Sequence, residues 1–230
     1  MEDEQRKDEN GEFLVLICEG KKFHVRKTAL FTQSKVFHTA FTGPFSSKWE
    51  SSSRTYKMSE DSLFIVNKMI DYFNNGDYDV SAVPEIEEQN ISALQFHARM
   101  FSLADKYAVD ILLSLSAAKY LDGLRNSEIV EFLGSIPAVY ELTPSYVRNL
   151  RDEAIKHARI NLPQGLGNPS VRQIYEGIAG TTPEFIKELL DSYMETPMIG
   201  KCWDCGSYQA LQGVQSRCLQ CGHDTTPPAC

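Results

Sequence analysis

Two closely spaced cysteine pairs near the end of the sequence constrain the fold more than any other feature. Cys202 and Cys205 form one C-x2-C motif, Cys218 and Cys221 form a second, and twelve residues separate the two pairs. A glycine follows each pair, and glycine permits the positive φ that a tight turn between two ligands requires. The spacing predicts that residues 197–230 form a small module in which four thiolates bind one Zn²⁺.

The complete set of four thiolates leaves no open position for water or substrate, so the predicted zinc is structural and not catalytic. Paired disulfides, a C-x2-C redox site and an iron–sulfur cluster are the alternatives. The charged residues 1–10 are unlike a secretory signal, which disfavours disulfides. We interpret His223 as a surface histidine and Cys230 as a free thiol. The module resembles a zinc ribbon, in which two knuckles on short β-hairpins hold one Zn²⁺.

The size of the chain allows a folded body that needs no metal. Its 230 residues are 42% hydrophobic and 23% charged, which is typical of one or two globular domains. The longest apolar run, residues 13–18, is far shorter than the roughly 20 residues of a membrane helix. We therefore expect an intracellular chain, nuclear or cytoplasmic, that does not bind a membrane.

The charge balance disfavours nucleic acid as a partner. The chain has 23 Lys and Arg against 31 Asp and Glu, a net charge of −8, whereas proteins that bind the phosphate backbone carry a basic surplus. In the cysteine module, Lys201 and Arg217 are balanced by Asp204 and Asp224. A formally neutral module binds phosphate weakly.

The apolar pattern predicts strands at the beginning of the chain. After an acidic flexible tail over residues 1–10, residues 13–18 form a buried strand and residues 22–25 an alternating one. Glu19-Gly20 between them indicates a turn, so the two strands are expected to form a hairpin. Residues 54–58 also have strand character.

Capping residues predict short helices around these strands. Ser34 is expected to cap a helix that ends at Gly43-Pro44. Ser59-Glu60-Asp61 is expected to open a second helix, with its two carboxylates at the positive end of the helix dipole, and Asn75-Gly76 to end it. The aromatic side chains of these and later helices are placed in the core: Phe37, Phe41, Phe64, Phe73 and Phe101.

The sequence from Asn90 onward has a helical period almost without a break. Asp110 is expected to cap one helix, and Thr143-Pro144 and Thr182-Pro183 to start two more, because a hydroxyl cap before a proline suits a helix N-terminus. Residues 163–169, rich in glycine and proline, are the best candidate for an internal linker.

Several blocks of the first half together resemble a BTB/POZ domain of the fungal type. In order, they are Phe13 to Leu30, Ser34 to Phe37, Met58 to Asp61, Met69 to Phe73, Gly76 to Tyr78, and Leu103 to Val109, which looks like the signature helix of the family. The resemblance covers residues 11–124. It implies an α+β fold with a small mixed sheet packed on a cluster of helices. Residues 125–196 would then be an all-helical extension, similar over residues 127–161 to that of many such proteins.

The resemblance also implies protein partners, among them a second copy of the chain in a homodimer. Some members of the family recruit a cullin ubiquitin-ligase scaffold through a hydrophobic-x-Glu signal. Here the corresponding residues are Lys48-Trp49-Glu50, with lysine in the hydrophobic position, which disfavours cullin binding. A further departure is Arg26-Lys27, where the family commonly has His-Lys.

A search for catalytic motifs gives no candidate catalytic or cofactor-binding residue. The sequence lacks a phosphate-binding loop, a serine nucleophile elbow and a zinc-protease helix. Gly165 and Gly167 match part of a dinucleotide loop, but Ser170 occupies the position of its third glycine. The remaining polar candidates are interpreted as structural histidines and a solvated acidic loop: His24, His38, His97, His157, Asp77, Asp79, Glu85, Glu87 and Glu88.

We therefore expect a non-enzymatic interaction protein, acting as an adaptor or in a transcriptional or chromatin assembly. One alternative is a nucleic-acid-binding protein that uses the zinc ribbon as its contact surface. The other is a substrate adaptor of a cullin ubiquitin ligase.

Overall fold

The computed structural model describes residues 12–43, 54–80 and 91–195, and the backbone of residues 199–201, 208–212 and 217–218. The chain forms two compact units. The first unit comprises Met1–Ser127 with Glu141–Thr143, and the second comprises Glu128–Tyr140 with Pro144–Cys230. Within the described part of the chain, no helix has the length and apolar character needed to cross a membrane.

The first unit contains a three-stranded mixed sheet with the strand order β2-β1-β3. β1 (Phe13–Cys18) and β2 (Lys21–Arg26) form the predicted antiparallel hairpin, and Glu19 and Gly20 adopt positive φ in its turn. β3 (Thr55–Lys57) pairs with β1 in parallel and confirms the strand predicted there.

The two faces of this sheet differ in burial, because successive side chains of a strand point to opposite faces. The inner face carries buried side chains of β1 and β2 that join the hydrophobic core: Leu14, Leu16, Cys18, Phe23 and Val25. The outer face carries the alternate residues of all three strands, which are partly or fully exposed.

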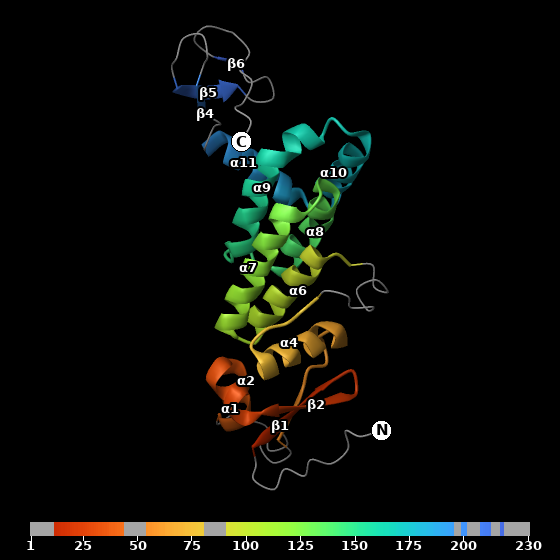
Figure 1. The fold of residues 1–230 in the computed structure, drawn as a ribbon, viewed down its shortest axis with the longest axis vertical. Coiled ribbons are helices and arrows are strands. Elements are labelled where there is room, and N and C mark those ends of the chain that lie inside the picture. The colour runs from red at the N-terminus through yellow and green to blue at the C-terminus, as the bar shows by residue number, and fades with distance from the viewer. Residues whose placement is uncertain are drawn as a thin grey trace. The chain divides into compact units, whose positions relative to one another are not determined.

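Five helices of the described residues complete the first unit: α1 (Lys27–Gln33), α2 (Lys35–Thr42), α4 (Leu63–Asn75), α6 (Ala93–Lys106) and α7 (Asp110–Asn126). α1 and α4 contact β2, and α6 and α7 pack side by side (Figure 1). The small mixed sheet and the cluster of helices confirm the predicted α+β class.

The five aromatic residues assigned to the core from the sequence are all buried, as predicted: Phe37, Phe41, Phe64, Phe73 and Phe101. Phe37 is at the centre of an aromatic cluster. Its ring stacks on that of Tyr107, with centroids 4.7 Å apart, and meets the ring of Tyr56 edge-on at 5.3 Å. Burial of such side chains is the main source of stability of this unit.

Local capping signals are confirmed at three helix ends. The Ser34 hydroxyl accepts a hydrogen bond from Phe37 N at 3.1 Å and caps α2, which ends at Gly43 as predicted. Gly76 follows α4 with φ 79°, a left-handed conformation that suits glycine.

The predicted start of α4 is wrong. The helix begins at Leu63, with Ser62 at the N-cap position and no acidic residue in its first turn. Asp61 instead lies before the helix, where its carboxylate accepts hydrogen bonds from Lys106 and Tyr107. These partners are more than forty residues away in sequence, so a local capping pattern does not reveal them. Likewise Asp110 is the first residue of α7 and not its cap, which is Val109.

The second unit is helical over its fully described residues. α8 (Ile129–Leu142) enters it, followed by α9 (Asn149–Gly165), α10 (Pro169–Thr181) and α11 (Pro183–Glu195). α11 packs against both α9 and α10 (Figure 1).

Two helices were predicted to start at Thr-Pro pairs. The predicted start at Thr143-Pro144 is wrong, and the position of the start at Thr182-Pro183 is confirmed. A hydrogen bond from Val147 N to the Pro144 carbonyl closes a turn after Thr143, and α9 starts later at Asn149. α11 does start at Pro183, but Thr182 Oγ1 is buried without a hydrogen-bond partner and does not cap the helix.

The predicted linker over residues 163–169 is wrong over most of its length. α9 continues through Pro163 to Gly165, and α10 starts at Pro169. Pro163 has no N–H to bond the Arg159 carbonyl. Tyr193 Oη donates to that carbonyl at 3.2 Å instead, so α11 compensates for the proline in α9.

Candidate functional site

A partly buried polar cluster joins the sheet, the segment before α4 and the end of α6. The Asp61 carboxylate accepts hydrogen bonds from Lys106 Nζ at 2.7 Å and from Tyr107 Oη at 2.5 Å. The Cys18 thiol donates to the Asp61 carbonyl oxygen at 3.1 Å. Ser34 Oγ donates to the Tyr107 carbonyl oxygen at 2.5 Å. The end of α6 is therefore held to both β1 and α2.

The protonation states in this cluster favour a structural role. Burial, reinforced by the hydrogen bond with Asp61, raises the pKa of Tyr107, so its hydroxyl stays a donor. Burial and the neighbouring carboxylates of Glu19 and Asp61 also raise the pKa of the Cys18 thiol. Because the thiolate is the form that reacts and binds metals, Cys18 is a poor nucleophile and a poor ligand.

Tyr107→Phe is expected to lower the free energy of unfolding by about 1.5 kcal/mol, because it removes a hydrogen bond to a carboxylate whose side chain is 7% exposed. The ring keeps its stacking on Phe37. Urea unfolding of the full chain, followed by circular dichroism, measures the change. Tyr146→Phe is the matched control, since that side chain is 81% exposed. Equal effects of the two substitutions would contradict the prediction.

A second buried cluster links α6 and α7 to the segment after α4. Tyr78 Oη and His97 Nδ1 are hydrogen-bonded at 2.9 Å. Lys119 Nζ donates to the Tyr78 carbonyl at 2.5 Å, pairs with Asp77 Oδ1 at 2.6 Å and lies 4.4 Å from the centroid of the Tyr78 ring. Asp77 is exposed, as predicted for the acidic loop, but it is ion-paired. Glu85, Glu87 and Glu88 lie outside the described residues.

Burial and charge fix the protonation of this second cluster. Burial, and then the positive charge of Lys119, lowers the pKa of His97 to about 4, so the imidazole is neutral at pH 7. Burial, and then the charge of Asp77, raises the pKa of Tyr78. The hydrogen bond from Lys119 lowers the pKa of Asp77. A neutral histidine beside a protonated tyrosine is a stable hydrogen-bonded pair and not an acid–base pair that works near pH 7.

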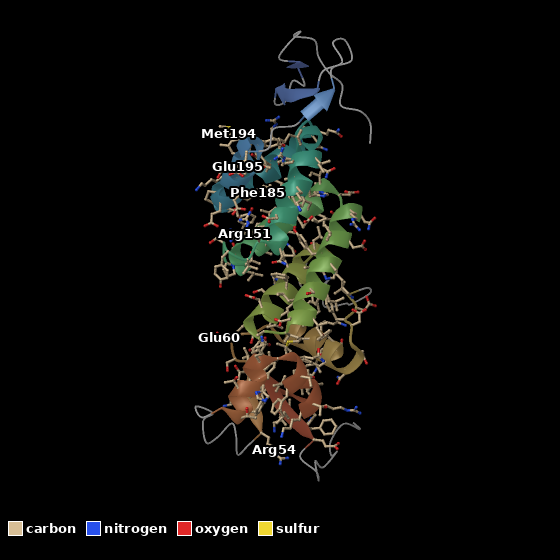
Figure 2. The ribbon with its side chains drawn as sticks, turned by 90° about the vertical axis from the view of Figure 1, so that its left-hand side faces the viewer. Arg54, Glu60, Arg151, Phe185, Met194 and Glu195 are labelled. Atoms are coloured by element: carbon tan, nitrogen blue, oxygen red, sulfur yellow. The ribbon has the colours of Figure 1, made fainter. Side chains whose placement is uncertain are left out.

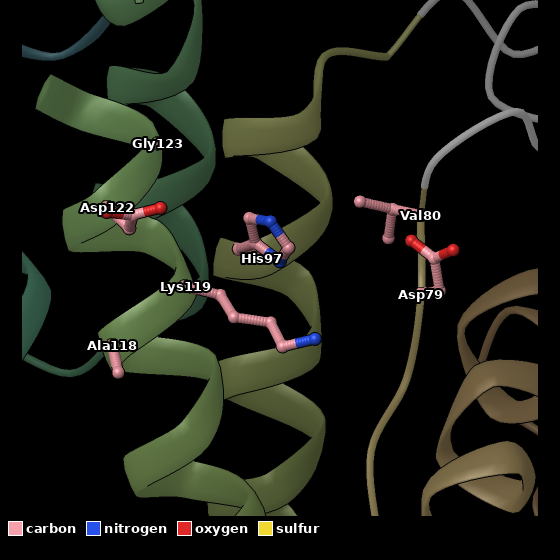
Figure 3. Close-up of a pocket in the computed structure, with 7 residues that line it drawn as sticks. All are labelled: Asp79, Val80, His97, Ala118, Lys119, Asp122 and Gly123. Carbon is pink, nitrogen blue, oxygen red and sulfur yellow. The ribbon is translucent and has the colours of Figure 1, made fainter. Parts of the chain in front are cut away.

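A shallow pocket of about 470 Å³ opens beside this cluster, and Figure 3 shows its lining residues: Asp79, Val80, His97, Ala118, Lys119, Asp122 and Gly123. Lys119 is paired with Asp77, and Asp122 lies 3.8 Å from Arg125. The charged groups of the pocket are thus already engaged within the protein.

The comparison with protein families decides the identity of this unit. Residues 3–114 match the BTB/POZ domain family. This part of the chain is a BTB/POZ domain. BTB/POZ domains mediate protein–protein interactions and are generally interaction modules rather than enzymes. A comparison with curated proteins gives no match to the chain.

The BTB/POZ domain has a second pocket, of about 490 Å³, at the end of β2. It is lined by residues of β2, α1 and α4: Arg26, Thr28, Ala29, Thr32, Phe73 and Asn74. Thr32 Oγ1 donates to the Thr28 carbonyl at 2.7 Å. The exposed guanidinium of Arg26 has no hydrogen-bond or ion-pair partner among the described residues, so this pocket offers an available positive charge.

The histidines predicted to be structural lie in different places. His24 is exposed on β2 and His38 is exposed on α2. His157 is half-buried, and its ring is tilted against that of Phe132 with the centroids 4.6 Å apart. Burial lowers the pKa of His157. Within the described part of the chain, no three His, Cys, Asp or Glu residues gather to hold a metal ion. The Lys48-Trp49-Glu50 segment, relevant to cullin binding, lies outside the described residues.

Of the four cysteines predicted to bind zinc, the structure describes only one, and only its backbone. Cys218 is in β6, and only its backbone is described; Cys202, Cys205 and Cys221 lie outside the described residues. The backbone around them forms a three-stranded antiparallel sheet of β4 (Ile199–Lys201), β5 (Tyr208–Gln212) and β6 (Arg217–Cys218), in the order β4-β5-β6.

A charged cluster in the second unit was not predicted from the sequence. Arg151 of α9 is 2% exposed and donates to the Tyr140 carbonyl at 3.1 Å and to the carboxylates of Glu184 and Glu188 at 3.2 and 3.3 Å. Tyr140 Oη and Arg148 Nη1 also donate to Glu188, each at 2.9 Å. Figure 2 labels Arg151 and also Phe185 of α11, whose ring lies edge-on to that of Tyr140 with centroids 5.7 Å apart. The helical spacing of Glu184, Glu188 and Asp191 is the sequence signal that could have indicated this acidic face of α11.

Proposed function

We propose that this chain is a non-enzymatic adaptor. Its BTB/POZ domain, which we take to be of the fungal type, binds protein partners that include a second copy of the chain. Its C-terminal module carries one structural Zn²⁺ on Cys202, Cys205, Cys218 and Cys221. The observation that carries the proposal is the BTB/POZ match over residues 3–114, since domains of this family mediate protein–protein interactions.

The internal use of polar groups supports a binding role over a catalytic one. In the BTB/POZ domain, the buried groups of Asp61, Tyr107, Tyr78 and His97 bond to one another or to nearby lysines. Their pKa values keep both tyrosines protonated and the histidine neutral near pH 7. These groups stabilise the fold and leave the surface of the domain for partners.

The backbone topology of the C-terminal strands supports the zinc ribbon. Cys202 and Cys205 belong to the connection between β4 and β5. β6 runs antiparallel to β5, so the chain returns through Cys218 toward the end of the sheet where that connection lies. A connection that contains one C-x2-C motif, at the end of the sheet toward which the strand of Cys218 runs, suits four-thiolate coordination of one Zn²⁺.

The biological setting that we propose is a transcriptional or chromatin assembly. The module from residue 201 to residue 230 is formally neutral, and this supports a protein-binding or structural module over one that contacts nucleic acid directly. The ribbon would then extend the interaction surface of the adaptor and not read a base sequence.

Native mass spectrometry of the full-length protein tests the metal and the oligomeric state together. We expect one zinc per chain and a mass of two chains. A double variant, Cys202→Ser with Cys218→Ser, is expected to lose the zinc, because it removes one ligand from each pair. Cys230→Ser is the matched control and should keep it.

Two outcomes would count against parts of the proposal. A wild-type chain without metal and with reduced cysteines would remove the zinc ribbon. A single-chain mass at micromolar concentration would remove the second copy as a partner and leave only heterologous partners.

A further inference from the structure

The outer face of the BTB/POZ sheet combines an apolar stripe with positive charge. β1 contributes Phe13, Val15 and Ile17, which are partly exposed and are absent from the hydrophobic core cluster. The residues paired with them lie on the same face. We call this set of eight residues the basic sheet face: Phe13, Val15, Ile17, Lys22, His24, Arg26, Thr55 and Lys57.

The strand register arranges these residues in rows across the sheet. Ile17 lies between Lys22 on β2 and Lys57 on β3. Val15 lies between His24 and Thr55 in the next row, and Phe13 pairs with Arg26 in the last. Neighbouring strands are about 4.8 Å apart. A ligand side chain above Ile17 therefore has a lysine on each side.

The positive charges of this face are available for a partner. Lys22, Arg26 and Lys57 are exposed and have neither a hydrogen bond nor an ion pair within the described part of the chain. The face contains three cations and no acidic residue, whereas the whole chain has a net charge of −8. Such a local excess of one sign attracts a ligand of the opposite sign.

The charges lie on both edge strands of the described sheet, β2 and β3. Lysines on an edge strand commonly prevent unwanted strand pairing, and Lys22 and Arg26 on β2 and Lys57 on β3 are all placed for that role. The same placement puts a lysine on each side of Ile17, so these cations also flank the apolar stripe of β1.

We infer that the basic sheet face binds an acidic peptide segment of a protein partner, one in which apolar side chains alternate with Asp or Glu. The apolar side chains pack on Phe13, Val15 and Ile17, and the carboxylates bind Lys22, Arg26 and Lys57. This inference rests on the proposed interaction role of the domain and specifies the chemistry of its partner. We choose an acidic peptide because its carboxylates complement the cations of the face. We choose alternating apolar and acidic side chains because successive residues of an extended peptide point to opposite sides.

The pocket at the end of β2 extends the same site. Arg26 belongs both to the basic sheet face and to the pocket of about 490 Å³ that contains Thr28, Thr32 and Asn74. A carboxylate that enters this pocket meets a guanidinium, which binds carboxylates in a bidentate geometry. Arg26 therefore connects the basic sheet face to this pocket.

Other occupants fit this face less well. Nucleic acid would use the three cations and the rings of Phe13 and His24, but the net charge of −8 of the chain opposes a phosphate backbone, and the aliphatic Val15 and Ile17 at the centre of the face offer no ring for stacking. The chain's own residues 1–10 supply carboxylates, but Met1 is their only apolar side chain, so they cannot cover the stripe. A peptide with both kinds of side chain satisfies both features of the face.

The test uses the full-length chain and a fluorescent peptide of seven residues in which Glu alternates with Val and Ile. Fluorescence anisotropy gives the Kd. The combined variant Lys22→Glu, Arg26→Glu and Lys57→Glu is expected to weaken binding by about tenfold or more, because it reverses three contacting charges. Val15→Ser should also weaken binding, by severalfold. A peptide with Lys in place of Glu should not bind.

The matched control carries the same change of net charge elsewhere: Lys35→Glu, Arg125→Glu and Lys187→Glu, all at exposed positions. It should bind the peptide like the wild type. Circular dichroism and the Tm of every variant confirm that it is folded. Equal binding by the two triple variants, or no binding by the wild-type chain, would overturn the inference.

Two further experiments would identify a different ligand of the basic sheet face. A twenty-nucleotide oligo-dT that binds more tightly than the peptide and is insensitive to Val15→Ser would assign the face to nucleic acid. A tenfold gain in peptide affinity on neutralising Glu2, Asp3, Glu4, Asp8 and Glu9 would assign it to the chain's own N-terminal segment. Native mass spectra of the same samples separate this question from the adaptor proposal. If a variant loses peptide binding but keeps its metal content and oligomeric state, the result bears on the basic sheet face and not on the adaptor proposal.

Discussion

Replacement of Arg151 by methionine is expected to destabilise the second unit by about 3 kcal/mol. Arg151 on α9 is 2% exposed and bonds to residues of α8 and α11. Methionine fills similar space, but it leaves the Tyr140 carbonyl and the Glu188 carboxylate without their buried donor. Removal of one partner from a buried charged cluster is strongly destabilising, because the groups that remain lose a donor that water does not replace; among the described residues, Glu188 keeps only its bonds from Arg148 and Tyr140.

Glu188 is the group that loses the most stabilisation when Arg151 is replaced. Burial alone would raise the pKa of Glu188, but hydrogen bonds from Arg148, Tyr140 and Arg151 outweigh it and lower the pKa below its usual range. Glu184 is 67% exposed and is screened by solvent, so we assign it no part of the effect. The Arg151 guanidinium also lies 4.4 Å from the centroid of the Tyr140 ring, and that contact is lost as well.

Amide hydrogen exchange, read by mass spectrometry on peptides from α9 and α11, measures this loss within the unit concerned. A change of about 3 kcal/mol corresponds to roughly hundredfold faster exchange. Arg148→Met is the matched control. It removes a bond to the same carboxylate from a side chain that is 43% exposed, and should cost less than about 1 kcal/mol. Similar exchange rates for the two variants would refute the role of burial.

Sequence patterns predicted the elements whose causes are local. The hairpin of β1 and β2 follows from a continuous apolar run, an alternating run and the Glu-Gly turn between them, although one face of β1 is only partly buried. The helix ends at Gly43 and Gly76 follow from residues within one turn. The start of α4 was missed because Asp61 is held by Lys106 and Tyr107. A capping rule considers only residues near in sequence, so it does not include hydrogen-bond partners that the tertiary fold brings close.

The same limit applies to the buried polar clusters. His97 was placed correctly on a helix, but its partner Tyr78 is nineteen residues away, and Lys119 comes from a further helix. Residues 163–169 indicated a linker because they are rich in glycine and proline, yet α9 continues through Pro163. The hydroxyl of Tyr193 on α11 satisfies the carbonyl that the proline leaves free, and no periodicity reports such a bond.

Acidification is expected to remove about 3 kcal/mol of stability from the BTB/POZ domain through His97. In the folded chain its pKa is about 4, against 6.5 for the ordinary side chain. Between these values the unfolded chain binds a proton and the folded chain does not, so unfolding becomes more favourable as the pH falls. At 1.36 kcal/mol per pH unit, the loss reaches about 3 kcal/mol near pH 4 and then stops, because below that pH both states are protonated.

Urea unfolding of the full-length chain at intervals from pH 7 to about pH 4 tests this expectation. Groups that face His97, namely Tyr78, Lys119 and Asp79, are the same in the wild type and in His97→Gln, so the difference between their pH profiles isolates the imidazole. The variant should lose about 3 kcal/mol less than the wild type over this range. His24→Gln is the control, because His24 is exposed on the sheet, and its profile should follow the wild type. Parallel profiles for wild type and His97→Gln would show that the buried imidazole does not take up its proton on unfolding.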